Sequence, residues 1–195
     1  MIAPHREPSA RRLSAAALGD EIASLVADGA AVLTFVGTDD RARAGAFGLH
    51  AVLLRDGQTI ALEAQVPGEA PRYPAITPRV PALHWDEREL RDLLGVVPEG
   101  HPDPRRLVLR AEWPDGLYPL RKDFDPSLAP PLPRHDSFPA RTVEGDEIVE
   151  IPVGPIHAGI IEPGHFRFSA VGETVLSLDA QLFYTHRGIE KIAEG

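Results

Sequence analysis

FGLHAVLLRDGQTIALEAQV, residues 47–66, is the segment that decides the fold. Apolar side chains dominate its two halves, residues 47–54 and 59–66, and Asp56-Gly57 lies between them. Asp-Gly is the strongest short hairpin signal, because the tight turn of a hairpin needs two residues with positive φ. The segment therefore predicts two antiparallel strands joined by a tight turn.

A helix and a strand are expected before this hairpin. Ser14 is a favourable N-cap, apolar residues recur at helical spacing from Leu18 to Val26, and Gly29 is suited to the C-terminal end. The apolar, β-branched run at residues 30–36 then predicts a buried strand.

A second helix is expected after the hairpin, with Leu90, Leu93 and Leu94 on its apolar face and Gly95 at its end. Asp86, Glu87 and Glu89 place negative charge in its first turn, where the helix dipole favours it. A pair of catalytic carboxylates is the alternative, but a solvated helical turn is the simpler interpretation of these acids.

The order of these elements predicts the α+β class, because strands and helices come in runs rather than in βαβ repeats. We expect a two-layer domain with a mixed sheet and flanking helices at residues 13–125, after a disordered N-terminus at 1–12. The proline-rich residues 126–147 are an expected linker, and residues 148–195 a small β-hairpin-rich C-terminal appendage. Strands are expected at residues 106–110, 148–153, 166–170 and 174–178, and a helix near His186.

Composition excludes several functions. The net charge of −9, from 29 acidic and 20 basic residues, disfavours binding to nucleic acid or to anionic lipid. No apolar run approaches the roughly 20 residues of a membrane-spanning helix. The absence of cysteine excludes disulfides and iron–sulfur clusters or zinc sites ligated by cysteines of this chain. We therefore expect a cytoplasmic chain without direct membrane insertion.

No catalytic signature is found. The sequence lacks the glycine motifs that bind dinucleotides or phosphates and the motif of serine hydrolases. His157 and His165 are eight residues apart with Glu162 between them, which suits polar groups in a turn better than zinc ligation. No catalytic, cofactor-binding or metal-ligating residue is assigned, and the chain alone is not expected to be catalytic.

Two rigid segments carry most of the remaining polar and aromatic residues. GHPDPRR, residues 100–106, is either a rigid corner between elements or a loop that docks onto a partner. WPDGLYPLRKDF, residues 113–124, contains a Pro-Asp-Gly turn, and its aromatic and basic residues suit either local packing or contact with another protein.

Together with WDERELRDLLGV, residues 85–96, the segments GHPDPRR and YPLRKDF resemble the family of C-type subunits of NADH-quinone oxidoreductase, respiratory complex I. The resemblance covers residues 13–125. It implies an α+β domain without a redox centre, located in the hydrophilic arm and packed against the large, quinone-site subunit. The residues that it implies for docking are His101, Asp103, Arg105, Arg106, Tyr118, Arg121, Lys122 and Asp123.

The end of the chain resembles a different protein. GPIHAGIIEPGHFRF, residues 154–168, and HRGIEK, residues 186–191, are similar to the start of the large subunit, in a form closer to energy-converting nickel-iron hydrogenases. The resemblance implies that His157, Glu162 and His165 face the quinone or the active site in the full complex. It also implies a fusion of the C-type subunit with a large subunit that ends before the nickel-ligating cysteines.

These resemblances lead to one expected function and one alternative. The chain is expected to be an assembly subunit of an NADH-quinone oxidoreductase-like complex, peripheral on the inner face of the cell membrane. Its expected partners are the large and the iron–sulfur subunits. No cofactor is expected on this chain, and iron–sulfur clusters or a nickel–iron centre are expected on the partners or on downstream segments. The alternative is the same module in an energy-converting nickel-iron hydrogenase. A free-standing enzyme is disfavoured, because no nucleophile, cofactor loop or metal set is found.

Overall fold

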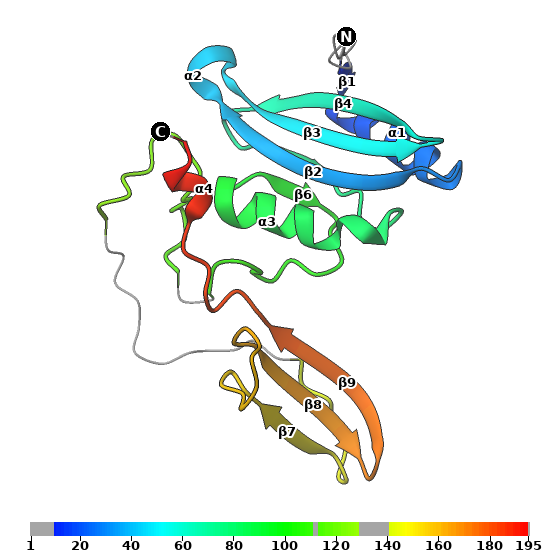
Figure 1. Ribbon diagram of the computed structural model, residues 1–195, viewed down its shortest axis with the longest axis vertical. Helices are drawn as coiled ribbons and strands as arrows, with labels where there is room; N and C mark the ends of the chain where they lie inside the picture. Colours follow the sequence, from blue (N-terminus) through cyan, green and yellow to red (C-terminus); the bar gives the residue numbers. More distant parts are fainter. Residues whose placement is uncertain (1–9, 111–112, 129–140, 195) are drawn as a thin grey trace, which may run out of the picture. The chain divides into compact units, whose positions relative to one another are not determined.

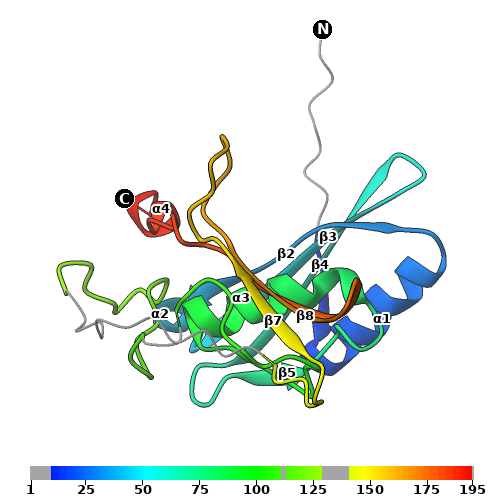
Figure 2. The same ribbon diagram turned by 90° about the horizontal axis from the view of Figure 1, so that it is seen from below.

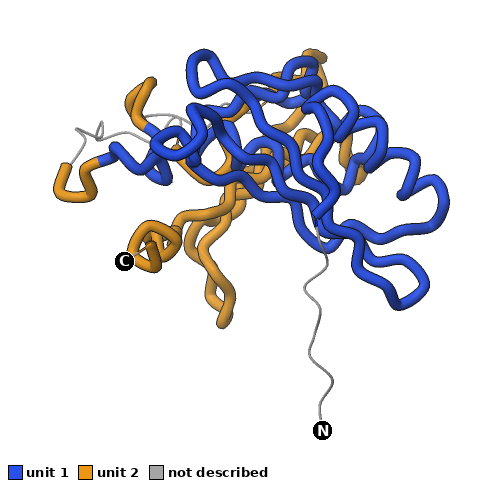
Figure 3. The backbone as a smooth tube through the Cα atoms, turned by 90° about the horizontal axis from the view of Figure 1, so that it is seen from above, with its two compact units in different colours: residues 1–104, 118–124 blue, residues 105–117, 125–195 orange. Residues whose placement is uncertain are grey.

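The computed structural model describes residues 10–110, 113–128 and 141–194 of the protein. It divides into two compact units, shown in different colours in Figure 3. The first unit comprises residues 1–104 and 118–124, and the second comprises residues 105–117 and 125–195. Residues 105–117 thus lie in the second unit, although the sequence pattern predicts that they belong to the first domain. The expected linker falls largely on residues 129–140, outside the described residues.

The first unit contains one four-stranded sheet, with strand order β1-β4-β3-β2. Strands β3 and β4 are antiparallel and meet at Asp56 and Gly57, which both have positive φ, so the expected hairpin is confirmed. Strand β1 runs parallel to β4, which makes the sheet mixed and confirms the expected α+β class. The elements are β1 (Arg11–Ser14), α1 (Ala15–Ala27), β2 (Ala31–Asp40), α2 (Arg41–Ala44), β3 (Ala46–Arg55), β4 (Gln58–Pro67), β5 (Arg72–Pro74), the 3-10 helix η1 (Pro81–Leu83), α3 (His84–Leu94) and β6 (Val97–Glu99).

Helices α1 and α3 cover one face of this sheet (Figures 1 and 2). Alternate residues of each strand point to that face, because successive side chains of a strand lie on opposite sides. Apolar residues of both helices and of the strands form one core. Its largest members include Leu18, Ile22, Phe35, Phe47, Leu49, Leu53, Leu62, Leu90 and Leu94.

The second unit contains a separate three-stranded antiparallel sheet, with order β7-β8-β9 (Figure 1). Its elements are β7 (Val149–Val153), β8 (His165–Val171), β9 (Thr174–Gln181) and the short helix α4 (Ile189–Ile192). The three strands expected from the sequence are confirmed, and the expected helix begins at Ile189 rather than near His186. Across the described parts of the chain, no helix has the length and apolar character needed to cross a bilayer.

Three expectations about local structure are wrong. Residues 30–36, expected to form a buried strand, contribute to β2 at the edge of the sheet, and only Ala30 and Phe35 among them are buried. Arg11 and Arg12, expected to be disordered, belong to β1, which gains its hydrogen-bond partners from β4, far away in the sequence. Residues 106–110, expected to form a strand, are bends and irregular backbone, although Val108 is buried. A short apolar run indicates burial but does not determine the backbone that buries it. The rest of the expected disordered N-terminus, residues 1–9, lies outside the described residues.

Candidate functional site

Helix α3 carries a carboxylate that is buried completely. Glu87 is 0% exposed, and its two carboxylate oxygens accept hydrogen bonds from the backbone N–H groups of Ile76 and Thr77, at 2.8 and 2.9 Å. The expectation that Glu87 belongs to a solvated turn is therefore wrong. Burial and the nearby Glu87 charge raise the pKa of Tyr73, and burial also raises the pKa of Asp86. Glu87 thus ties α3 to the loop that precedes η1.

The loop at residues 100–104 is held against α3 by buried groups. His101 Nδ1 accepts from Asp103 N at 3.1 Å, so the ring is protonated at Nε2, which donates to the carbonyl of His84 at 3.2 Å. The two histidine rings are 4.9 Å apart. Asp103 also pairs with Arg88 at 3.6 Å, and Arg91 donates to the carbonyl of Pro104. His101 and Asp103 thus fix the loop from inside, and their expected docking role stays a prediction.

The segment at residues 118–124 is fixed to the end of α3. Arg121 Nε donates to the carbonyl of Leu94 at 2.7 Å, which satisfies an acceptor in the last helical turn. Its guanidinium lies over the ring of Tyr118 at 4.1 Å and over that of Phe47 at 5.2 Å. Burial, and then the nearby charge of Arg41, lower the pKa of Arg121.

An ion-pair cluster joins the same segment to β2. Arg41 contacts Asp39 and Asp123, each at 2.7 Å, and the backbone N–H of Lys122 donates to Asp39 at 2.8 Å. The hydrogen bonds from Arg41 hold the pKa of Asp39 well below its ordinary value and also lower the pKa of Asp123. Of the expected docking residues in this segment, Lys122 and Asp123 are exposed, whereas Tyr118 and Arg121 are half-buried.

The Asp39 cluster predicts a pH dependence of stability. Because the folded pKa of Asp39 lies below the ordinary value of 3.8, its ionised form stabilises the fold above pH 3.8, and this contribution is lost as the pH falls further. Asp39→Asn should lower the free energy of unfolding by about 1–2 kcal/mol at neutral pH, and by less near pH 2. Urea unfolding at both pH values measures the difference.

Asp123→Asn provides the comparison for this prediction. The Asp123 side chain is 68% exposed, so solvent screens its interaction with Arg41 and its effect on stability should be smaller. An Asp39→Asn effect that is the same at both pH values would show that the ionised carboxylate does not contribute.

Helix α3 also presents an exposed tryptophan that the sequence pattern did not single out. Trp85 is 53% exposed and lies on the side of the helix away from Leu90 and Leu94. The 3.6-residue period of the helix was the signal that could have found it, because Trp85 is out of phase with the apolar face. Tryptophan is enriched among residues that dominate the energy of protein interfaces.

A known protein family matches the part of the chain that contains α3 and the two segments fixed to it. Residues 14–129, more than half of the chain, match the family described as the respiratory-chain NADH dehydrogenase 30 kDa subunit. The chain belongs to this family. The matched residues include both segments described above and all of α3, so they form a module like the C-type subunit of complex I.

Relatives of this 30 kDa family member occur in two kinds of complex. The chain is 44% identical to formate hydrogenlyase subunit 5 of Escherichia coli over 81% of its own length, and 36% identical to the C/D subunit of NADH-quinone oxidoreductase of Bacteroides thetaiotaomicron over 71%. It spans 29% of the length of each of these two relatives. A chain of the membrane-bound sulfane sulfur reductase, an archaeal respiratory membrane complex, has the same fold, with a TM-score of 0.53, 23% identity and coverage of 72% of this chain and 92% of that one.

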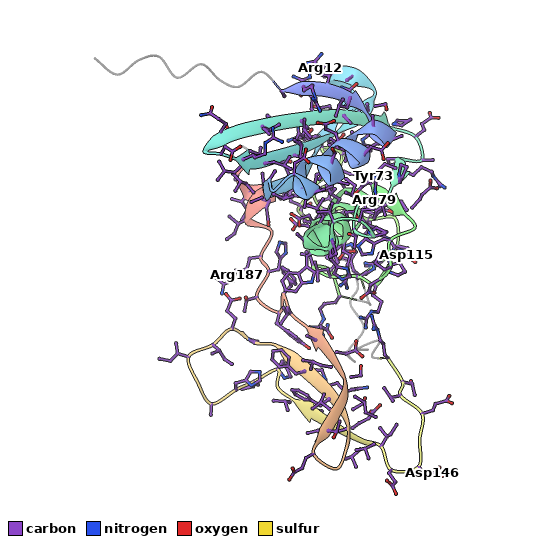
Figure 4. All side chains as sticks on the ribbon, turned by 90° about the vertical axis from the view of Figure 1, so that its right-hand side faces the viewer. Arg12, Tyr73, Arg79, Asp115, Asp146 and Arg187 are labelled. Carbon is purple, nitrogen blue, oxygen red and sulfur yellow. The ribbon has the colours of Figure 1, made fainter. Side chains whose placement is uncertain are left out.

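The arginines expected to dock onto a partner make contacts inside the second unit. Arg105 pairs with Asp179 of β9 at 2.9 Å, and Arg106 pairs at 2.6 Å with Asp115, which is labelled in Figure 4. The Asp115 side chain is fully exposed, so the pair with Arg106 lies at the surface. The docking role of both arginines stays a prediction.

The loop between β7 and β8, residues 154–164, contains the residues expected to face the quinone or the active site. His157 donates to the carbonyl of Gly164 at 2.7 Å, and His165 donates to that of Gly154 at 3.3 Å, so both histidines close the base of the loop. Glu162 is exposed. Among the described residues, no group of three or more histidines and acids is arranged to hold a metal ion. The roles of His157, Glu162 and His165 in a full complex stay predictions.

Proposed function

We propose that the chain is a structural and assembly subunit of the hydrophilic arm of a membrane-associated complex of the NADH-quinone oxidoreductase type. In this role it supports the large, quinone-site subunit, contacts the iron–sulfur subunit and carries no redox centre. The complex holds it at the cytoplasmic, inner face of the cell membrane. The observation that carries the proposal is membership in the 30 kDa family by a chain without cysteine.

The docking face that we propose combines α3 with the two segments fixed to it, residues 100–104 and 118–124. Hydrogen bonds to α3 hold each segment in place, from His101 to the carbonyl of His84 and from Arg121 to the carbonyl of Leu94. Preformed surfaces lose little conformational entropy on binding, which favours affinity. Trp85 supplies a large apolar side chain on this face, and Lys122 and Asp123 supply exposed charges.

Assembly with the large subunit tests this proposal. The chain is expressed with an affinity tag together with the other subunits of the complex, and the recovered large subunit is identified and quantified by mass spectrometry. Trp85→Ala should weaken the assembly by about 2 kcal/mol, roughly 30-fold, as is typical of a central interface residue. Its effect on stability should be small, because the side chain is half in solvent.

Val36→Ala is the matched control. Val36 lies on β2 and is 48% exposed, close to the 53% of Trp85. Its neighbour Phe35 is buried in the core, so Val36 points to the sheet face opposite α3 and lies outside the proposed docking face. Equal recovery with both variants would place the interface elsewhere, and failure of the wild-type chain to recover a large subunit would refute the proposed function. Arg121→Ala is unsuitable for this purpose, because Arg121 also holds the end of α3.

The hydrogenase alternative is favoured by one observation. The two hydrogenase-type relatives, formate hydrogenlyase subunit 5 and hydrogenase-4 component G of Escherichia coli, are 44% and 42% identical to the chain, compared with 36% for the C/D relative of Bacteroides thetaiotaomicron. Under this alternative the module is the same, and the electron-transfer partner is a nickel-iron large subunit. The nickel content of the complex recovered with the tagged chain distinguishes the two branches.

A further inference from the structure

The sheet of the second unit has one strongly apolar face. In its register, Ile151 of β7 lies opposite Phe168 of β8, which lies opposite Leu178 of β9. Residues two positions apart along a strand point to the same side of the sheet. The neighbouring cross-strand sets on this side are therefore also apolar. The face consists of Val149, Ile151, Val153, Phe166, Phe168, Ala170, Val175, Leu178 and Ala180.

The opposite face of the same sheet is polar and is held by other parts of the second unit. Asp179 is only 6% exposed, and it accepts hydrogen bonds from Arg105 Nη1 at 2.9 Å and from the backbone N–H of Arg141 at 2.7 Å. Ser169, which precedes Ala170 on β8, is also buried. Since these contacts occupy the polar face, they leave the apolar face pointing outward from the unit.

Several apolar side chains of this face are about half exposed to solvent, which is unusual for so many neighbouring apolar residues. Ile151 is 47% exposed, Leu178 51%, Val175 55% and Val149 58%. Single exposed apolar residues are ordinary, but a contiguous set on one sheet face marks an interaction site. The loop between β7 and β8 carries a further fully exposed apolar side chain, Ile160.

We propose that this face docks against an apolar layer of the large-subunit domain, an inference that rests on the proposed function. A sheet with one apolar face is stable when a second layer covers that face. The face carries no ionisable side chain, which suits an apolar protein layer. The relatives provide the polypeptide for such a layer, because 29% of the length of formate hydrogenlyase subunit 5 corresponds to this chain and the remainder lies outside it.

Cysteine labelling tests the proposal directly, because the chain contains no cysteine of its own. Ile151→Cys places a thiol on the apolar face, and Glu150→Cys places one on the polar face of the same strand. The two positions are matched, since Ile151 and the Glu150 side chain are each 47% exposed. Each variant is treated with a maleimide, and modification at that position is followed by peptide mass spectrometry.

In the isolated chain, the two thiols should react at similar rates. In the complex recovered with the large subunit, the Ile151→Cys thiol should react at least about tenfold more slowly, as expected in the dry core of an interface. The Glu150→Cys thiol should keep its rate. Equal rates in the complex would overturn the inference while leaving the proposed function intact, whereas a wild-type chain that recovers no large subunit would overturn both.

Two further outcomes would also overturn the inference. Protection of the Ile151→Cys thiol that grows with the concentration of the isolated chain would assign the face to a second copy. Protection by phospholipid vesicles alone would assign it to a membrane surface. In each case the Glu150→Cys thiol shows whether the protection is confined to the apolar face.

Discussion

Glu87→Ala is expected to lower the free energy of unfolding of the first unit by about 3 kcal/mol or more. The substitution leaves the backbone N–H groups of Ile76 and Thr77 without the carboxylate that accepts them. Each buried donor that loses its partner costs about 1–3 kcal/mol. Both N–H groups belong to buried residues and cannot turn to water instead. Urea unfolding followed by far-UV circular dichroism measures the change.

Two variants make this prediction specific to the buried carboxylate. Glu89→Ala removes an acid from the exposed side of the same helix and should change the stability by less than about 1 kcal/mol. Glu87→Gln keeps one acceptor oxygen but turns an amide donor toward an N–H group. Its loss of stability should therefore lie between those of Glu87→Ala and Glu89→Ala. A Glu87→Ala protein as stable as wild type would mean that water replaces the carboxylate without loss.

Gly95→Ala is expected to be destabilising by about 2–4 kcal/mol, from backbone strain and overpacking together. Gly95 follows α3 with φ +73, a conformation that favours glycine. A Cβ atom there would lie 2.6 Å from Arg121 Nη2 and from the ring of Tyr118, the two side chains that cover the end of the helix. The substitution therefore displaces the segment at residues 118–124 as well as straining the backbone.

Gly57→Ala separates these two contributions. Gly57 has nearly the same φ, +74, but a Cβ atom there would meet no atom within 4 Å. It should cost only the strain of the left-handed conformation, about 1–2 kcal/mol. Thermal or urea unfolding of both variants gives the difference, and equal losses would show that Arg121 and Tyr118 move aside freely.

The sequence predicted the parts of this fold that depend on local signals. The Asp56-Gly57 turn predicted the hairpin, and the apolar segments at residues 47–54 and 59–66 predicted its two strands. It could not reveal the parallel pairing of β1 with β4, because that contact joins segments about fifty residues apart in the chain, such as Arg11 and Leu62. Long-range pairings leave no periodic pattern at either segment.

In the candidate site, too, the features with local sequence signals could be predicted and those that depend on distant residues could not. The rigid segments at residues 100–106 and 118–124 were visible in the sequence, because prolines and turn residues mark them. The inward orientation of His101 and the burial of Glu87 were not visible, since a polar residue in a first helical turn or a loop is usually solvated. Only the positions of Ile76, Thr77 and His84 in space give these side chains their partners.

The division of the chain into interleaved units bears on how a gene of this kind can be split. The polypeptide leaves the first unit at residue 104, contributes residues 105–117 to the second, and returns for residues 118–124. A gene boundary just after residue 124 would therefore keep the first unit whole but place residues 105–117 on a different polypeptide from β7, β8 and β9. The pair between Arg105 and Asp179 would then join two separate proteins, so fission of the gene would itself create an interface between polypeptides from contacts that are intramolecular here.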